Sequence, residues 1–136
     1  MTQALDDIVV IDFSDGRSGS VASMVLSDFG AEVIKIEPTC GDPYRIFPQS
    51  YLWNRGKKSV TMDLNTPDGR ENARALIMQA DVVLESFRPG EAKQFGIDYE
   101  SIKSDRPDLV YCSITAFGPN GPYSQYKPYD AIVSAK

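Results

Sequence analysis

The chain has 136 residues, of which 42% are apolar, and it carries 14 basic against 19 acidic side chains, a net charge of −5. The excess of acid argues against general nucleic-acid binding, and no apolar run approaches the roughly 18 residues that cross a membrane. A small anionic ligand is still compatible with this charge, because a few well-placed cations suffice to bind one.

The first 37 residues predict a βαβ unit. Residues 8–13 are a β-branched apolar run typical of a buried strand, and residues 15–20 are small and polar, which indicates a tight loop. Apolar residues then recur at helical spacing over residues 21–29, Gly30 stands where a helix C-cap belongs, and residues 33–36 form a second apolar strand. Strands this apolar need cover on both faces, so we expect an α/β fold with a parallel sheet and flanking helices.

The rest of the chain continues the alternation of strand and helix. Residues 38–58 lack periodicity, which predicts an irregular segment that is functional or covers another element. Strands are predicted at residues 59–64, 81–85 and 109–114, and helices at 67–80, 91–95 and 99–104, the first with Thr66 as its N-cap. Residues 129–136 look like the opening of a helix. We expect residues 1–136 to be one Rossmann-like domain, cut from a longer chain.

The sequence contains no histidine. Its absence excludes histidine bases, Ser-His-Asp and Cys-His pairs and most zinc sites within these residues. Cys40 and Cys112 lack the spacing of metal ligands, so we expect two free thiols in a reducing compartment, with Cys112 in the core and no metal. The first ten residues have no basic region typical of a signal peptide, and we therefore expect a cytoplasmic protein.

Ligands of an open parallel sheet bind beyond the carboxyl ends of its strands. The predicted loops at that edge contain Arg17, Arg88 and Lys127. The first of these loops precedes a helix whose unpaired N–H groups favour an anion, which predicts a phosphorylated ligand. The alternative is that Gly16 and Gly19 only form a tight turn. NAD is disfavoured because the G-x-G-x-x-G pattern is incomplete.

Other polar features have a structural explanation that competes with ligand contact. Lys57 and Lys58 are expected to be exposed to solvent where a strand begins. Asp12 is expected to be a structural carboxylate whose hydrogen bonds are satisfied within the protein. The tyrosines at 123, 126 and 129 fit packing or surface positions as well as a ligand site. Cys112 is no candidate nucleophile, because no histidine is present to form its thiolate.

Eight short segments form an ordered set of motifs along nearly the whole chain. They are residues 5–13, 29–38, 41–43, 54–64, 67–70, 80–90, 107–114 and 117–123. Their ordered set resembles the N-terminal part of the family III CoA-transferases, which include formyl-CoA and carnitine CoA-transferases and, as a side branch, α-methylacyl-CoA racemases. Each motif is weak alone, but the ordered set is specific.

The resemblance implies the transfer of CoA from an acyl-CoA to a small carboxylic acid, by a longer chain that forms an interlocked homodimer. The family's catalytic aspartate forms a mixed anhydride and then an aspartyl-CoA thioester. It lies beyond the Tyr-Asp motif at residues 129–130, so no catalytic residue is expected in this segment, which by itself is expected to be inactive.

The CoA contacts of the family fall, position by position, on Arg17, Ser18, Pro38, Met62, Asn65, Ser86, Phe87, Arg88, Gln94, Phe95, Lys127 and Tyr129. Ser86 replaces the usual Asn, and Gln94 replaces an Arg that often contacts the CoA phosphates. Racemases of the superfamily have a histidine base at about the place of Tyr129, which favours a transferase over an acyl-CoA racemase or isomerase. A nucleotide-binding α/β module without chemistry of its own is the third hypothesis.

Overall fold

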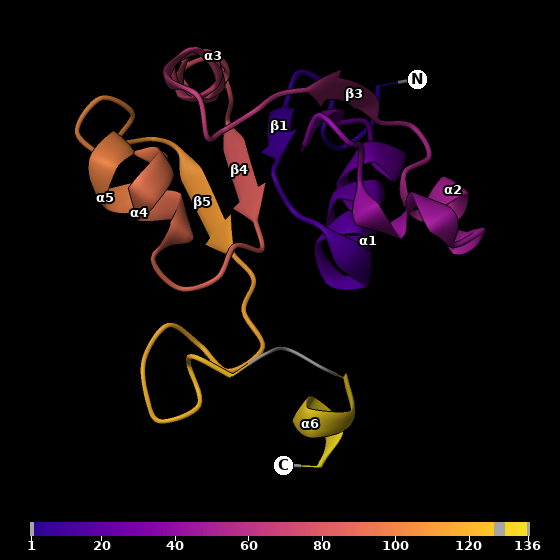
Figure 1. The fold of residues 1–136 in the computed structure, drawn as a ribbon. Helices are drawn as coiled ribbons and strands as arrows, with labels where there is room; N and C mark the ends of the chain where they lie inside the picture. The colour runs from indigo at the N-terminus through magenta and orange to yellow at the C-terminus, as the bar shows by residue number, and fades with distance from the viewer. Residues whose placement is uncertain (1, 127–129, 136) are drawn as a thin grey trace.

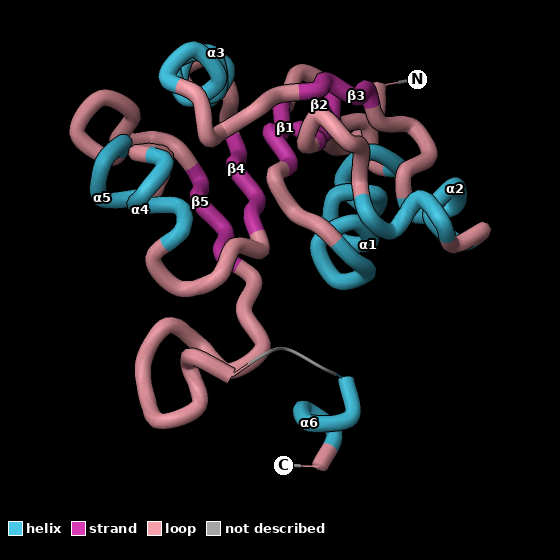
Figure 2. Tube along the Cα trace, viewed as in Figure 1, coloured by secondary structure: helices cyan, strands magenta, loops and turns pink. Residues whose placement is uncertain are grey.

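Five short strands form one parallel sheet in the order β3-β2-β1-β4-β5 (Figures 1 and 2). The computed structural model describes residues 2–126 and 130–135. The strands are β1 (Val9–Asp12), β2 (Glu32–Glu37), β3 (Lys58–Thr61), β4 (Val82–Glu85) and β5 (Val110–Ser113). In the central strand, Val10 is in register with Val33 of β2 and with Val82 of β4. The predicted parallel α/β fold is confirmed.

Helices cover both faces of this sheet. The helices of the described residues are α1 (Gly16–Asp28), the 3₁₀ helix η1 (Pro43–Ile46), α2 (Gln49–Trp53), α3 (Pro67–Ile77), α4 (Glu91–Phe95), α5 (Tyr99–Ile102) and α6 (Asp130–Ser134). Helix α6 lies away from both faces, beyond the strand ends (Figure 1). Figure 1 shows α1 and α2 on one side of the sheet, and α3, α4 and α5 on the other. Within the described residues, no helix is long and apolar enough to span a membrane.

The two faces of the sheet differ in polarity. On the α3 side, Ile11, Ile36 and Val83 pack against Ala73 and Ile77 of α3 in the larger apolar cluster. On the α1 side, a smaller apolar cluster covers only one end of the sheet. The alternation of side chains along a strand places Asp12 and Lys35 on this α1 side, where both are buried. The α1 side therefore holds a buried polar layer as well as an apolar one.

Two expectations about the loops are wrong. Residues 15–20 are not a loop, because α1 already begins at Gly16. Gly16 has a positive φ of 69°, which lets the chain turn directly from the loop after β1 into the helix. The segment 38–58 is not irregular either, since it contains η1 and α2.

Several local expectations are confirmed. Thr66 caps α3, because its Oγ1 accepts a hydrogen bond of 3.1 Å from the Gly69 N–H. Gly30 follows α1 with a positive φ of 107°, as expected of a glycine at a helix end. Cys40 and Cys112 are free thiols, but the expectation that Cys112 is buried is wrong. It lies on the edge strand β5, on the same face as the exposed Val110.

Candidate functional site

A cleft of about 870 Å³ opens at the carboxyl ends of β1, β4 and β5. Its walls are the first turn of α1, the loops of residues 86–89 and 114–117, parts of η1 and α2, and residues of the C-terminal segment. Ligand pockets have volumes of about 300 to 1,000 Å³, so this cleft has the size of a ligand site. It also lies at the edge of the sheet where the sequence predicted a site.

Two cations in this cleft lack a carboxylate partner. Arg17 and Arg88 make no ion pair with any residue that the structure describes, whereas four of the other five arginines do. The first turn of α1 contains no acidic residue, and no side chain caps its N–H groups. The positive end of this helix therefore faces the cleft together with two guanidinium groups, an arrangement that favours an anionic ligand.

The segment that contains η1 and α2 packs against the start of α1. The Arg17 guanidinium lies 5.6 Å from the centre of the Trp53 ring, within the range of a cation–π contact. A Cβ atom added at Gly16 would meet the Tyr44 ring at 3.2 Å, which shows how closely the two segments approach. Trp53, Tyr44 and Phe47 of this segment line the cleft.

Three consecutive residues of the loop after β4, Ser86, Phe87 and Arg88, each take part in a hydrogen bond that holds the loop. The Asp15 N–H donates to Ser86 Oγ over 3.0 Å, which ties this loop to the start of α1. The next two N–H groups, of Phe87 and Arg88, donate to carboxylates, at 2.6 Å to Glu85 Oε2 and at 2.9 Å to Glu91 Oε2. The loop can thus present the Arg88 side chain to the cleft from a fixed backbone.

Glu85 is buried beneath this loop. Its burial raises its pKa above 4.5, although hydrogen bonds from Ser113 and from the Phe87 N–H act in the opposite direction. On the same face of the sheet, burial and the charge of Glu85 raise the pKa of Tyr111. The Tyr111 hydroxyl donates to the Ile97 carbonyl over 3.0 Å.

The structure brings together five of the residues predicted to contact CoA. Arg17, Ser18, Ser86, Phe87 and Arg88 line the cleft, and they come from segments about 70 residues apart in sequence.

The other predicted residues that the structure describes do not line this cleft. Met62 packs against the apolar core, and the Asn65 side chain donates to Asp63 Oδ1 over 3.0 Å. Pro38 follows β2 and Gln94 lies on α4. Phe95 contacts the Phe87 ring edge-on, with centroids 5.5 Å apart, and so supports the loop from behind. Lys127 and Tyr129 lie outside the described residues. All these contacts stay predictions.

Sequence reasoning missed the aromatic wall of the cleft. Tyr44, Phe47 and Trp53 lie in the segment that was expected to be irregular, and their side chains reach the cleft only because η1 and α2 fold over the start of α1. The available signal was four aromatic residues within ten positions of a segment already suspected of a function. For Tyr123 and Tyr126 the sequence left packing and ligand contact open; they contact each other edge-on with centroids 5.4 Å apart, and Tyr126 lines the cleft.

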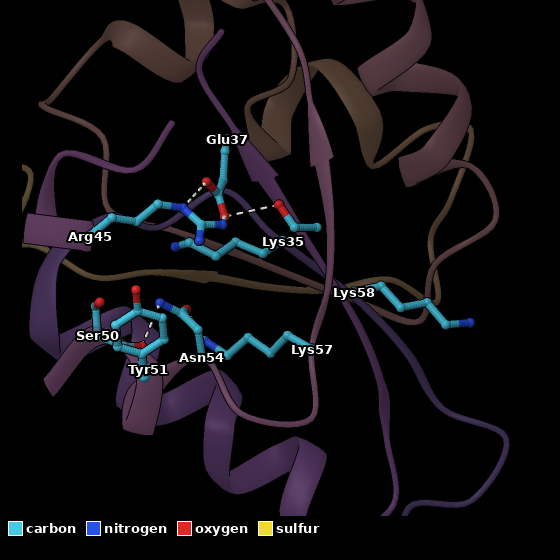
Figure 3. A pocket seen from close by; sticks show the side chains of 9 residues that line it. Lys35, Glu37, Arg45, Ser50, Tyr51, Asn54, Lys57 and Lys58 are labelled. Atoms are coloured by element: carbon cyan, nitrogen blue, oxygen red, sulfur yellow. Dashed lines mark hydrogen bonds and ion pairs between the residues drawn. The ribbon is translucent and has the colours of Figure 1, made fainter. Parts of the chain in front are cut away.

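A second, smaller cavity of about 210 Å³ lies between α2 and strands β2 and β3, on the α1 side of the sheet (Figure 3). Figure 3 shows Lys35, Arg45, Asn54 and Lys57 around it and Lys58 pointing away. Arg45 binds Glu37 through two hydrogen bonds of 2.8 and 2.6 Å. Burial alone would raise the pKa of Glu37, but these bonds and those from Asp42 and Ser59 lower it to about 2.

The charges around this smaller cavity neutralise one another. Lys57 Nζ lies 3.3 Å from Asp12 Oδ2, and Lys35 Nζ lies 3.2 Å from Asp42 Oδ2. The expectation for Asp12, a satisfied structural carboxylate, is confirmed, whereas Lys57 is buried rather than solvated. Lys58 is exposed and pairs with Glu32 at 2.6 Å. We therefore interpret this cavity as a structural polar layer that ties η1 and α2 to the sheet.

Comparison with known proteins identifies the family. The sequence profile described as CoA-transferase family III matches residues 5–136. The chain belongs to CoA-transferase family III. The resemblance inferred from the ordered motifs is thus confirmed. Within the described residues, no group of three or more acidic or cysteine side chains is placed to hold a metal ion.

Curated members of CoA-transferase family III match nearly all of the chain. It is 39% identical to the succinate–glutarate CoA-transferase of Agrobacterium fabrum, over 95% of this chain and 36% of that protein. It is 38% identical to a formyl-CoA:oxalate CoA-transferase of Rhodopseudomonas palustris, over 97% of this chain and 33% of that protein. The chain thus spans about a third of the length of these curated relatives.

A solved structure of the family shares the fold. The crystal structure of Rv3272 from Mycobacterium tuberculosis superposes with a TM-score of 0.93 and 41% sequence identity, over 99% of this chain and 40% of that one. Rv3272 is named a probable fatty acyl-CoA transferase. A putative β-ketoacyl-ACP reductase also superposes, with a TM-score of 0.52 at 14% identity, which shows a common sheet architecture alone.

Proposed function

We propose that residues 1–136 form the CoA-binding domain of an enzyme that transfers CoA from an acyl-CoA donor to a small free carboxylic acid. The observation that carries this proposal is a pair of arginines, Arg17 and Arg88, which have no carboxylate partner among the described residues and meet the open N-terminus of α1 in one cleft. CoA carries phosphate groups, and guanidinium groups and helix N-termini are the protein groups that bind phosphate best. Family membership supplies the reaction class.

The reaction exchanges one thioester for another. The C–S bond of the donor breaks and a C–S bond forms at the acceptor carbon. In the net reaction the donor gains one oxygen and leaves as a free carboxylate, and the acceptor carboxylate loses one oxygen. No oxidant or external energy source is needed, because a thioester bond is both consumed and made. The chain's own residues have the task of holding the CoA moiety while its acyl group is replaced.

We place the nucleophile outside these residues, as an aspartate that forms a mixed anhydride and then an aspartyl-CoA thioester. The support is the family resemblance together with the nature of the cleft. Asp15 is the acid among the described residues that line it, and its Oδ1 accepts a hydrogen bond of 3.1 Å from Ser86 Oγ. This bond gives Asp15 a structural task between two walls of the cleft.

We further propose that the protein acts as an interlocked homodimer in the cytoplasm. The support in this chain is exposed apolar surface on η1 and α2, where the side chains of Ile46 and Tyr51 are 80% and 78% exposed. Exposed apolar patches of this kind mark surfaces that other chain segments or partners cover.

Arg88 provides the test of CoA binding. In the longest chain that the gene encodes, Arg88→Gln should weaken CoA binding about 10- to 100-fold, the value of a charge-assisted hydrogen bond, measured by isothermal titration calorimetry. Lys93→Gln is the matched control, because Lys93 is exposed, carries the same charge and lies outside the cleft. Equal affinities of both variants would contradict the proposed site.

Transfer itself is tested by incubating an acyl-CoA with an isotopically labelled carboxylic acid. Label should appear in the thioester, and no deuterium should enter the α-position of a 2-methylacyl-CoA in heavy water. The opposite result, α-exchange without transfer, would support a racemase or isomerase. CoA binding with neither activity would support a non-catalytic nucleotide-binding module.

A further inference from the structure

Asp15 stands at the N-cap position of α1, but its side chain does not cap the helix. An acid at this position ordinarily accepts hydrogen bonds from the free N–H groups of the first helical turn. The Asp15 carboxylate instead accepts a hydrogen bond of 3.1 Å from Ser86 Oγ, in the loop after β4. The N–H groups at the start of α1 are therefore left without this carboxylate as a partner.

The Ser86 hydroxyl holds Asp15 at two points. It accepts a hydrogen bond of 3.0 Å from the Asp15 N–H, and it donates its own proton to Asp15 Oδ1. The two residues are 71 positions apart in sequence and follow β1 and β4, which are neighbours in the sheet. The backbone and the carboxylate of Asp15 are thus both fixed from the opposite wall of the cleft.

Asp15 is a negative charge in a cleft that otherwise favours anions. It is the acid among the described residues that line this cleft. A carboxylate that can turn freely toward a helix N-terminus or a guanidinium competes with an anionic ligand for the same donors. Within the described residues, neither Arg17 nor Arg88 pairs with Asp15, although all three line the cleft.

We propose that Ser86 is a positioning residue that holds the Asp15 carboxylate away from the anion-binding groups of the cleft, so that they stay open to the phosphate groups of the ligand. This inference rests on the proposed function and deepens it, because it concerns how the same cleft keeps its affinity for an anion. Asp15 is then a competitor that the fold restrains. Two other roles of the Ser86 hydroxyl make different predictions: direct contact with the ligand, and a clasp that only sets the spacing of the two walls.

The experiment measures CoA binding by isothermal titration calorimetry in the longest chain that the gene encodes. Ser86→Ala releases Asp15 and should weaken binding about 3- to 10-fold, the effect of a competing carboxylate at a helix N-terminus. Asp15→Ala removes the competitor and should bind CoA at least as tightly as the wild type. The double variant should also bind at least as tightly as the wild type, because no carboxylate is left to be released.

Two further variants are controls. Ser86→Thr keeps the hydroxyl and should retain the wild-type affinity. Ser101→Ala removes an equivalent hydrogen bond outside the cleft, from Ser101 Oγ to the carboxylate of Asp98 at the N-cap position of α5, and should leave CoA binding unchanged. Asp15 is exposed and Ser86 is half-buried, so all variants should fold, which circular dichroism and thermal denaturation verify.

Restoration of binding in the double variant decides between the three roles. A double variant as weak as Ser86→Ala would overturn the inference and assign Ser86 to the ligand itself. Weaker binding by Asp15→Ala alone would overturn it in favour of a clasp that sets the spacing, and unchanged binding by Ser86→Ala would show that Asp15 needs no restraint.

A wild type that does not bind CoA would contradict the proposed function but not yet this inference. Inorganic pyrophosphate then replaces CoA in the same titrations. Weaker pyrophosphate binding by Ser86→Ala, restored in the double variant, would support the inference without the proposed function. No binding of pyrophosphate, or equal binding by all variants, would overturn it.

Discussion

Asp12 and Lys57 form an ion pair whose side chains are 0% and 1% exposed. Asp12 also accepts hydrogen bonds from the Ser14 N–H at 2.9 Å and from the Ser23 hydroxyl at 2.5 Å. Burial lowers the pKa of Lys57, and the charge of Asp12 counteracts that effect. Each charge is therefore tolerated in the interior because the other is present.

Replacing Lys57 by Met should be strongly destabilising, because it leaves the Asp12 charge buried and unpaired. Removal of one partner of a buried pair costs about 3 to 5 kcal/mol, which urea denaturation would measure as a loss in the free energy of unfolding. Lys58→Met is the matched control: its exposed pair with Glu32 should contribute less than about 1 kcal/mol. The double variant Asp12→Asn, Lys57→Met should recover part of the loss, and no recovery would contradict the pairing argument.

The buried Glu85 carboxyl should make the stability of the folded protein depend on pH. Because burial raises its pKa above 4.5, the folded protein binds this proton more readily than the unfolded chain does. The contribution of Glu85 to stability therefore falls as the pH rises from about 4.5 through its folded-state pKa.

The variant Glu85→Gln should remove this pH dependence while keeping an oxygen that can accept the Phe87 N–H. Its melting temperature, measured from pH 4.5 to 7.5, should change less with pH than that of the wild type. It should be at least as stable as the wild type near neutrality. Glu71→Gln, at an exposed position, is the control, and a variant that loses stability mainly at neutral pH would contradict the argument.

The first turns of helix α1 pack closely against the loop that precedes the helix. A Cβ atom at Gly19 would stand 2.1 Å from the Ser14 Cβ, and Ser14 cannot retreat easily because its carbonyl accepts the Lys35 ammonium at 2.6 Å. This close approach sets where the N-terminus of α1, and hence Arg17, lies relative to the strand ends.

Gly19→Ala should therefore destabilise the protein even though alanine is the better helix former. Overpacking costs about 1 to 3 kcal/mol, against a gain of about 1 kcal/mol from helix propensity. Ser18→Ala, one residue earlier and exposed, should be neutral or slightly stabilising in the same thermal denaturation experiment. An increase in stability of Gly19→Ala would show that α1 can shift away from Ser14.

Elements with their own periodicity or caps were predictable from the sequence. The strands around Ile11, Ile34 and Val83 are rich in β-branched apolar residues, and Thr66 caps α3 through a hydrogen bond three residues along the chain. The elements η1 and α2 were missed, because their residues show no helical periodicity and the two elements depend on contacts with α1, whereas the equally short α4 and α5 were expected. One such contact is that of the Arg17 guanidinium with the Trp53 ring.

The candidate site was predictable where its residues belong to loops expected at strand ends, as Arg17 and Ser86 do. The partners of Asp12 were not, because Lys57 is 45 residues away and only the packing of α2 brings it in. Trp53 likewise has no local signal that separates a ligand wall from a surface ring. The places of Lys57 and Trp53 in the fold depend on contacts between segments that are distant in sequence. Sequence patterns mainly indicate interactions between residues that are close in sequence.

At the scale of the whole molecule, the strand order decides where the cleft lies. The chain continues from β1 to β2 on one side and later returns to β4 on the other side of β1. The loops that follow β1 and β4 consequently belong to connections that run in opposite directions, and a crevice forms between them. The acidic chain thus has two unpaired cations at this one edge, although its net charge is −5.

The isolated 136-residue chain should bind CoA without transferring it, because the proposed nucleophile lies elsewhere. Purified residues 1–136, checked for folding by circular dichroism, should give no label exchange between acyl-CoA and a labelled acid. The longest chain that the gene encodes should give exchange under the same conditions. Transfer by the short chain would locate the reacting group among these residues.

The two surface thiols offer a direct view of how the sheet behaves when a ligand enters. Cys40 follows β2 and Cys112 lies on β5, so they stand on opposite sides of the central strand, and both are exposed. Spin labels attached there need no engineered cysteine within these residues, and the distance between them reports any hinge between the two halves of the sheet. An unchanged distance on adding CoA would identify a rigid, preformed receptor.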